Sequence, residues 1–347
     1  MTLRPRQVKL GFAQGRAYNK TMEEKKYQFG ELTELHVHVG SAADPPIMWE
    51  IAQDQGIKLP TKNYWDFEKL ITTSHKTTYD KYLDLFKWTE LIQSSPEAME
   101  KSIYSIAAGA YRKNNITTLE IRFNPMKRNR GGERDLDHII LASIHAMEKA
   151  MLAYPIKVGL IFCFDRSFSP EMNYIIAKKA IKYAGRGVVA IDLAGPIAGS
   201  FRLTSLTEMV KDCKKAGLGV TIHTGEVTGP EEVREVIQCL QPDRIGHGVR
   251  AAEDDALLEE IASRGIVLEI CPTSNESTGV VKDFSDFKKI FQKLKEKKVA
   301  YTINTDGPEM LKTNLLNEYQ RLLDNNILEV KDLLEASKRA KAATFIK

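Results

Sequence analysis

Short apolar runs rich in β-branched residues recur along this chain, and amphipathic stretches separate them. Most runs are almost continuously apolar, which is typical of parallel strands covered by helices on both faces. We expect strands at residues 34–39, 118–123, 157–164, 188–194, 219–224, 244–249, 266–271 and 299–305. We expect helices at residues 135–152, 170–183, 205–216, 230–239, 253–263 and 284–297. Eight strands alternating with helices predict a parallel α/β sheet, and eight is the number that closes a (β/α)8 barrel.

An open, doubly wound sheet is the alternative, but it favours a glycine-rich phosphate turn after the first strand, and the sequence has none there.

One connection is much longer than the others, because residues 40–117 pass through several helical patterns before the second strand. Loops after barrel strands lie at the face where active sites are built, so we interpret 40–117 as a helical lid. A structural decoration remote from the site is the alternative. The whole barrel domain is expected to span 31–347, after a basic extension at 1–30.

Composition excludes several classes of protein. The 347 residues include 50 basic and 46 acidic side chains, and this balance favours neither a nucleic acid nor a membrane surface as partner. No apolar run approaches the ~20 residues of a membrane-spanning helix. The four cysteines are scattered without a Cys-x-x-Cys pair, which favours a reducing compartment and a cytoplasmic location.

Histidines concentrate on the expected strands. His36 and His38 lie two residues apart, so their side chains project from the same face of the first strand. His223 takes the inward phase of the fifth strand, and Asp306 follows the eighth. Three imidazoles and a carboxylate around one point suit zinc best. The alternative, hydrogen-bonded polar groups in the core, would require partners for each of them.

Seven segments, in order along the chain, resemble motifs of the adenosine/AMP deaminase branch of the amidohydrolase superfamily. They are Glu34-Leu35-His36-Val37-His38, Leu119-Glu120-Ile121-Arg122-Phe123, Ile191-Asp192-Leu193-Ala194-Gly195, Ile222-His223-Thr224-Gly225-Glu226, Arg244-Ile245-Gly246-His247-Gly248, Leu268-Glu269-Ile270-Cys271-Pro272 and Asn304-Thr305-Asp306. The resemblance runs from about residue 30 to residue 347. It implies a (β/α)8 fold in which one zinc ion is held by His36, His38, His223 and Asp306.

The resemblance also implies how the site works. Glu226 corresponds to the family's proton donor to a ring nitrogen, a role that needs a buried carboxyl with a raised pKa. His247 corresponds to the residue that orients the attacking water, and Asp306 is expected to accept a proton from that water. Gly195 and His38 are expected to contact the substrate. The fourth strand ends in Asp192-Leu193-Ala194 without a lysine that could bridge two metals, which favours a single ion.

Two further pairings are expected from the strand phases. Glu269 lies in the inward phase of the seventh strand and is a candidate partner of a ligand imidazole. Glu120 and Arg122 share one face of the second strand and are expected to form a buried ion pair.

Two positions depart from the family pattern. The acidic residue that usually follows the apolar position after His-x-His is missing, because Val39 is followed directly by Gly40. Gly307 stands where the family has a second aspartate, and Glu309, Asp44 or a lid residue would have to substitute. With these two departures, the resemblance implies a zinc-dependent hydrolytic deaminase of a small-molecule substrate, an aminated purine or purine nucleoside. The alternatives are a metal-dependent hydrolase of another cyclic C–N or ester substrate, and a barrel that binds a ligand without turnover.

Overall fold

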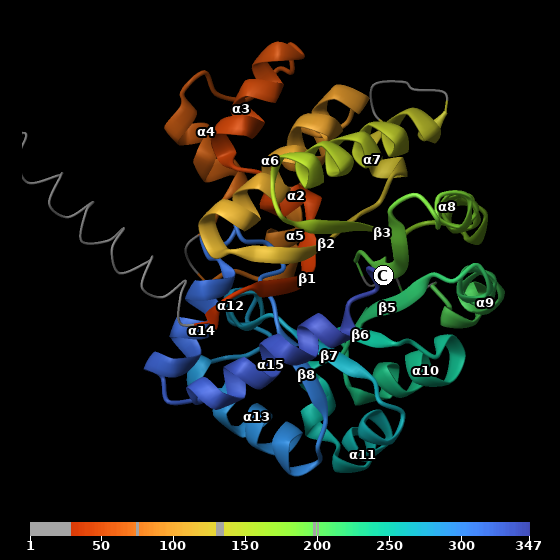
Figure 1. The fold of residues 1–347 in the computed structure, drawn as a ribbon, viewed down its shortest axis with the longest axis vertical. Coiled ribbons are helices and arrows are strands. Elements are labelled where there is room, and N and C mark those ends of the chain that lie inside the picture. The colour runs from red at the N-terminus through yellow and green to blue at the C-terminus, as the bar shows by residue number, and fades with distance from the viewer. Residues whose placement is uncertain (1–28, 74–75, 130–134, 197–198, 200) are drawn as a thin grey trace, which may run out of the picture.

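A computed structural model describes residues 29–73, 76–129, 135–196, 199 and 201–347. Eight strands form one sheet in sequence order, and every neighbouring pair is parallel (Figure 1). They are β1 (Leu32–His38), β2 (Ile116–Phe123), β3 (Lys157–Asp165), β4 (Val188–Ala194), β5 (Gly219–Thr224), β6 (Arg244–His247), β7 (Val267–Ile270) and β8 (Ala300–Ile303). The predicted (β/α)8 barrel and its eight strands are confirmed. The expected extension at 1–30 lies almost wholly outside the described residues.

The barrel closes through residues that follow β8. The backbone N–H of Asp306 donates to the carbonyl of His36 (2.9 Å), and that of His38 donates to the carbonyl of Asp306 (3.0 Å). Val37 and Asp306 form a parallel bridge. This closure places the carboxylate of Asp306 beside the two histidines of β1.

Helices cover the outside of the barrel between successive strands (Figure 1). They are α7 (Leu136–Ala153), α8 (Pro170–Lys182), α9 (Thr207–Lys215), α10 (Pro230–Leu240), α11 (Asp255–Ser263), α13 (Phe287–Glu296), α14 (Leu315–Asp324) and α15 (Val330–Ala343), with the short α12 (Pro272–Ser277) after β7. Pro170 and Pro230 occupy the first turn of their helices, where a missing N–H costs nothing. The six expected helices are confirmed, with ends shifted by a few residues.

The long connection after β1 is helical, as expected. It contains α2 (Val39–Ala42), α3 (Pro45–Asp54), α4 (Tyr64–Ile71), α5 (Tyr79–Ile92) and α6 (Pro96–Asn114). Figure 1 shows α3 and α4 projecting from one end of the molecule. In contrast, α5 reaches the barrel centre, because the hydroxyl of Tyr82 lies 3.3 Å from a carboxylate oxygen of Asp306. The part of the insertion nearest to the candidate site is therefore α5.

The polar interior of the barrel corrects one expectation. Arg122 and Glu120 do not pair with each other. Arg122 donates to Asp192 (2.9 Å) and to Glu269 (2.8 Å), whereas Glu120 accepts from Arg244. The expectation was wrong because side chains two residues apart on a strand run roughly parallel to each other. Inside a barrel, inward side chains of different strands meet end to end and pair more readily.

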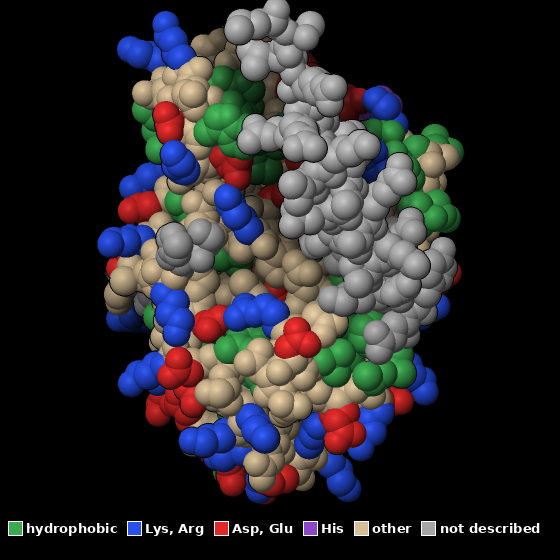
Figure 2. Space-filling view, turned by 90° about the vertical axis from the view of Figure 1, so that its left-hand side faces the viewer, with side chains coloured by type: hydrophobic (Ala, Val, Ile, Leu, Met, Phe, Trp, Pro, Cys, Tyr) green, Lys and Arg blue, Asp and Glu red, His purple; other side chains and the backbone are tan. Residues whose placement is uncertain are grey.

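The outer surface carries both signs of charge. Basic and acidic side chains are interspersed over the lower part of the face in Figure 2. Many of these residues form ion pairs with each other, such as Lys297 with Glu259 (2.6 Å) and Lys293 with Asp255 (2.9 Å). Within the described ranges, none of the helices combines the length and the apolar character that crossing a bilayer requires.

Candidate metal and catalytic site

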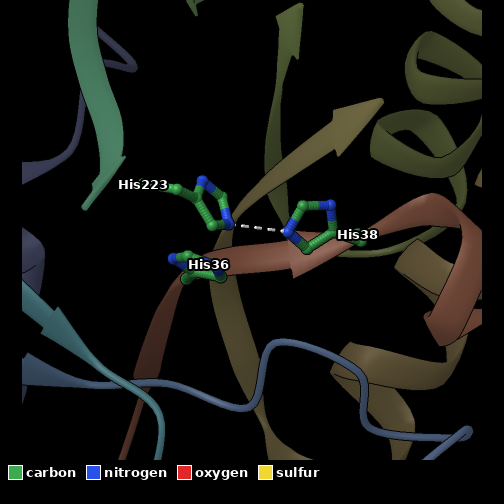
Figure 3. A group of neighbouring side chains, drawn as sticks. All are labelled: His36, His38 and His223. Atoms are coloured by element: carbon green, nitrogen blue, oxygen red, sulfur yellow. Dashed lines mark hydrogen bonds between the residues drawn. The ribbon is translucent and has the colours of Figure 1, made fainter. Parts of the chain in front are cut away.

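Three imidazoles converge at the carboxyl ends of β1 and β5. Figure 3 shows His38 and His223 pointing toward each other, with His36 beside them. The Nε2 atoms of His38 and His223 are 3.1 Å apart. Ligand nitrogens around a tetrahedral zinc ion, with bonds of about 2.0–2.1 Å, lie about 3.3 Å from one another. The spacing of His38 and His223 therefore matches that of two ligands on one ion.

Asp306 completes this group. Its Oδ1 lies 3.4 Å from Nε2 of His38 and 3.8 Å from Nε2 of His36. Its Oδ2 accepts hydrogen bonds from Ser274 Oγ (2.6 Å) and Tyr82 Oη (3.3 Å). The two hydroxyls hold one carboxylate oxygen, so the other is left facing the imidazoles.

Two buried carboxylates determine which imidazole nitrogens are available as ligands. His36 Nδ1 lies 2.7 Å from Glu269, and His223 Nδ1 lies 2.9 Å from Asp192. An ionised carboxylate only accepts hydrogen bonds, so both imidazoles carry a proton on Nδ1, and Nε2 is the nitrogen left to bind a metal. Burial raises the pKa of Glu269, but Arg122 and Arg244 outweigh it and bring that pKa to about 2. Glu269 is therefore placed as we expected, as a partner of His36.

The donor set fits a divalent metal ion. Nε2 of His36 is buried and has no hydrogen-bond partner. Burial lowers the pKa of His36 and of His38 well below the usual range, so both rings are neutral. Nε2 of His38 and Nε2 of His223 lie only 3.1 Å apart, a spacing that a cation or a proton between the two nitrogens accommodates. An unpaired buried nitrogen beside two imidazoles and a carboxylate is what a zinc ion with mixed N/O ligands requires.

A second group of possible ligands shares His36. It adds His247 and Cys271, whose donor atoms also lie within 4.8 Å of one another. Burial raises the pKa of the Cys271 thiol well above its usual range, and its Sγ lies 3.5 Å from the carbonyl of Glu269. A neutral thiol is a poor ligand, so the group with His38, His223 and Asp306 is the better metal site.

Glu226 and His247 lie beside the histidine cluster. Oε2 of Glu226 is 3.7 Å from Nε2 of His247. Burial raises the pKa of Glu226 to about 8, and Asp306 adds to this effect. Glu226 is therefore protonated at neutral pH, as the expected role of proton donor requires.

His247 is neutral, and its orientation is fixed. Burial lowers its pKa to about 3. The side-chain amide of Asn275 donates to Nδ1 of His247 (2.9 Å), which leaves the ring proton on Nε2, the nitrogen nearer to Glu226. Both His247 and Asp306 adopt left-handed backbone conformations with φ of 62°, which are uncommon for residues other than glycine and cluster at functional sites.

Two cavities meet at Gly195. One, of about 420 Å³, is bounded by His38, by residues of α5 and by the ends of β2, β3 and β4. The other is small and is bounded by His223, Glu226 and Tyr79. Gly195 has φ of 92°, and a Cβ there would lie 2.7 Å from Asp165, so only glycine fits. Gly195 and His38 thus line the space next to the cluster, where a substrate contact is expected.

Helix α5 packs against both positions that depart from the family pattern, Gly307 and Gly40. A Cβ at position 307 would lie 2.8 Å from Tyr82 Oη, and one at position 40 would lie 2.7 Å from Phe86. The acids considered as substitutes are occupied elsewhere. Asp44 and Glu309 both bind Lys113, at a separate cavity that none of the clustered histidines lines.

Sequence reasoning missed several supporting residues. Asp192 lies in the inward phase of β4 and could have been found from that phase. Ser274 and Asn275 follow β7 in α12, and Tyr82 belongs to the insertion, so neither periodicity nor spacing signals their contacts with Asp306 and His247.

The fold and the site define an α/β barrel with a histidine- and carboxylate-rich centre. The family model for adenosine deaminase matches residues 32–347. An adenosine deaminase of Clostridium kluyveri is 30% identical over 314 residues, which cover 90% of this chain and 89% of that protein. The chain therefore belongs to the adenosine deaminase family, and with it to the hydrolytic deaminases, which confirms the resemblance seen in the motifs.

Solved structures agree in fold. An amidohydrolase from Burkholderia ambifaria with bound Zn has a TM-score of 0.81 to this chain at 18% identity, and covers 93% of this chain and 87% of its own. The ADAL–IMP complex has a TM-score of 0.80 at 25% identity, and covers 94% of both chains.

Proposed function

We propose that this protein is a zinc-dependent hydrolytic deaminase of an aminated purine or purine nucleoside. The observation that carries the proposal is the convergence of His36, His38, His223 and Asp306 beside a buried, protonated Glu226. Membership of the adenosine deaminase family supports the reaction class. The purine nucleotide IMP in the ADAL structure supports a purine substrate.

A bound zinc ion would supply an activated water, because zinc lowers the pKa of a water ligand to about 7. The four side chains named above would hold that ion. Glu269 and Asp192 orient two of these ligands by accepting from their Nδ1 protons. Ser274 and Tyr82 orient the carboxylate of Asp306, the group assigned to accept the water's proton.

The remaining steps fall to Glu226 and His247. Protonated Glu226 donates to the ring nitrogen next to the carbon that bears the amine, which makes that carbon a better electrophile. His247 is neutral with its proton on Nε2, so it can orient the attacking water and donate to the oxygen as charge develops there. The amino group then takes up the proton held by Asp306 and leaves as ammonia. The new hydroxyl group gives its remaining proton back to Glu226, so the product carries a carbonyl group.

The test is an amine-release assay with zinc-loaded protein, which measures ammonia from adenine, adenosine and AMP and methylamine from their N6-methyl forms, with aminated pterins and pyrimidines as further candidates. We expect release from at least one purine, and loss of release after chelation that zinc restores. No release from the whole panel by protein that holds one zinc ion would contradict the proposal. Hydrolysis of a cyclic amide or ester under the same conditions would favour the alternative hydrolase.

A further inference from the structure

The end of the barrel opposite the candidate site is closed by the segment that follows α15. The ring of Phe345 fills the space next to Gly219, the first residue of β5, so that a Cβ at position 219 would overlap it. A Cβ at Gly159, near the start of β3, would lie 2.8 Å from Ile346. In Figure 1 the end of the chain, marked C, lies among the strands. These residues therefore cover the amino-terminal mouth of the barrel.

This segment provides hydrogen bonds to a buried carboxylate. The hydroxyl of Thr344 (2.7 Å) and the backbone N–H of Phe345 (2.6 Å) both donate to Oε1 of Glu120. The other oxygen of Glu120 accepts from Arg244, which also donates to the carbonyl of Ala343 (2.7 Å). The guanidinium of Arg244 stacks on the ring of Phe345, 3.8 Å from its centre.

The same arginine continues the network toward the candidate site. Nε of Arg244 donates to Oε1 of Glu269 (2.6 Å), and Oε2 of Glu269 lies 2.7 Å from Nδ1 of His36. The side chains of Glu120, Arg244 and Glu269 are at most 1% exposed. A continuous path of buried polar contacts thus joins residues 344–345 to the imidazole whose Nε2 is unpaired.

We propose that Thr344 and Phe345 are positioning residues for the metal site, acting through Glu120 and Arg244 on Glu269 and so on His36. The inference rests on the metal site of the proposed function. Loss of the Thr344 hydroxyl would remove a hydrogen-bond donor to Glu120, and loss of the Phe345 ring would remove the stacking partner of Arg244. In both cases Arg244 would shift its hydrogen bonds away from Glu269. Changes to partners of ligands typically cost 10–100-fold in metal affinity. Phe345 lies two contacts beyond Glu269 and Thr344 lies three, so their effect is expected to be smaller, about 3–10-fold.

The experiment measures the Kd for zinc of the metal-free full chain, by competition with a chromogenic chelator. Thr344→Val removes the hydroxyl donor at nearly constant volume, and Phe345→Ala removes the stacked ring. We expect each to raise the Kd about 3–10-fold. Thr344→Ser keeps the hydroxyl and should bind zinc like the unmodified chain. Ile346→Ala is the matched control, because its side chain packs against Gly159.

The outcomes separate the two proposals. If the unmodified chain binds no zinc, the proposed function fails. If it binds zinc, and Thr344→Val and Phe345→Ala bind equally tightly, only the positioning role is overturned. The unfolding temperature of each metal-free variant is measured in parallel, because a merely structural role would lower it and leave the Kd unchanged. An Ile346→Ala effect on the Kd as large as that of Thr344→Val would also overturn the proposal. If Phe345→Ala does not fold, Thr344→Val still decides.

Discussion

The two ends of the barrel contain equally buried polar groups that are bonded in opposite ways. At the amino-terminal end, both oxygens of Glu120 accept hydrogen bonds, and Arg244 has carboxylate and carbonyl acceptors together with an aromatic ring. At the carboxyl end, Nε2 of His36 has no hydrogen-bond partner, and His247 and Asp306 adopt left-handed backbone conformations. The amino-terminal end, at Glu120 and Arg244, is therefore saturated with hydrogen bonds. The carboxyl end instead contains two strained backbone conformations and a buried ring nitrogen that lacks a hydrogen-bond partner.

The same contrast appears in two glutamates of this barrel. Burial raises the pKa of Glu226 to about 8. Burial acts on Glu269 in the same direction, but Arg122 and Arg244 lower its pKa to about 2. The difference shows that charge partners decide which buried carboxyl is a fixed anion and which is a proton donor. Polar groups without such partners mark the end of the barrel where chemistry is expected.

The largest expected effect comes from removing the protonated carboxyl. Glu226→Gln keeps the shape but cannot exchange a proton, so we expect kcat/KM to fall about 10²–10⁴-fold with zinc still bound. The measurement is steady-state ammonia release together with metal content. Glu231→Gln, an exposed change in the first turn of α10, is the control and should keep near-normal activity. Near-normal activity of Glu226→Gln would contradict the role given to Glu226.

Breaking the saturated end should affect stability. Arg244→Met leaves two buried carboxylates without a shared cation, and we expect the free energy of unfolding to fall by about 3–5 kcal/mol. Denaturant titration of the metal-free protein measures it. Arg250→Met removes an exposed ion pair with Glu253 and should cost at most about 1 kcal/mol. Similar costs for the two variants would contradict the contrast between the barrel interior and its surface.

A smaller effect is expected where α5 meets the site. Gly307→Ala places a Cβ 2.8 Å from Tyr82 Oη and 2.9 Å from Ser41, so we expect a loss of about 1–3 kcal/mol from overpacking. Adding Tyr82→Phe removes the hydroxyl and should recover part of that loss in a double-mutant cycle. The control is Gly109→Ala in α6, where a Cβ meets nothing within 4 Å and alanine favours the helix. Full additivity of the first two changes would show that Tyr82 does not occupy that space.

The last and most gradual expected effect is the dependence of kcat/KM on pH. Activity needs protonated Glu226, so kcat/KM should be retained below its pKa of about 8 and lost as the pH rises through that value. A bound cation nearby favours the ionised form, so the alkaline limb should lie at or below pH 8. A kcat/KM profile that stays flat to pH 10 would argue against a catalytic proton on Glu226.

The strands, and the convergence of the residues expected as ligands, could be predicted from the sequence because they depend on local pattern. Continuous apolar runs marked the strands, and the two-residue period placed His36 and His38 on one face. The contacts that orient these residues depend on register between distant segments. Arg244 bonds Glu120 across the barrel, and Tyr82 reaches Asp306 from the insertion. No local pattern carries that information, so the saturated end of the barrel was not foreseen, and the pairing expected within β2 was wrong.

The most direct test of the account is anomalous diffraction at the zinc edge from crystals of the zinc-loaded protein. We predict one strong peak on the barrel axis, within about 2.0–2.2 Å of Nε2 of His36, His38 and His223 and of Oδ1 of Asp306. A peak bound by other side chains, or no peak in protein shown to be folded, would contradict the central claim.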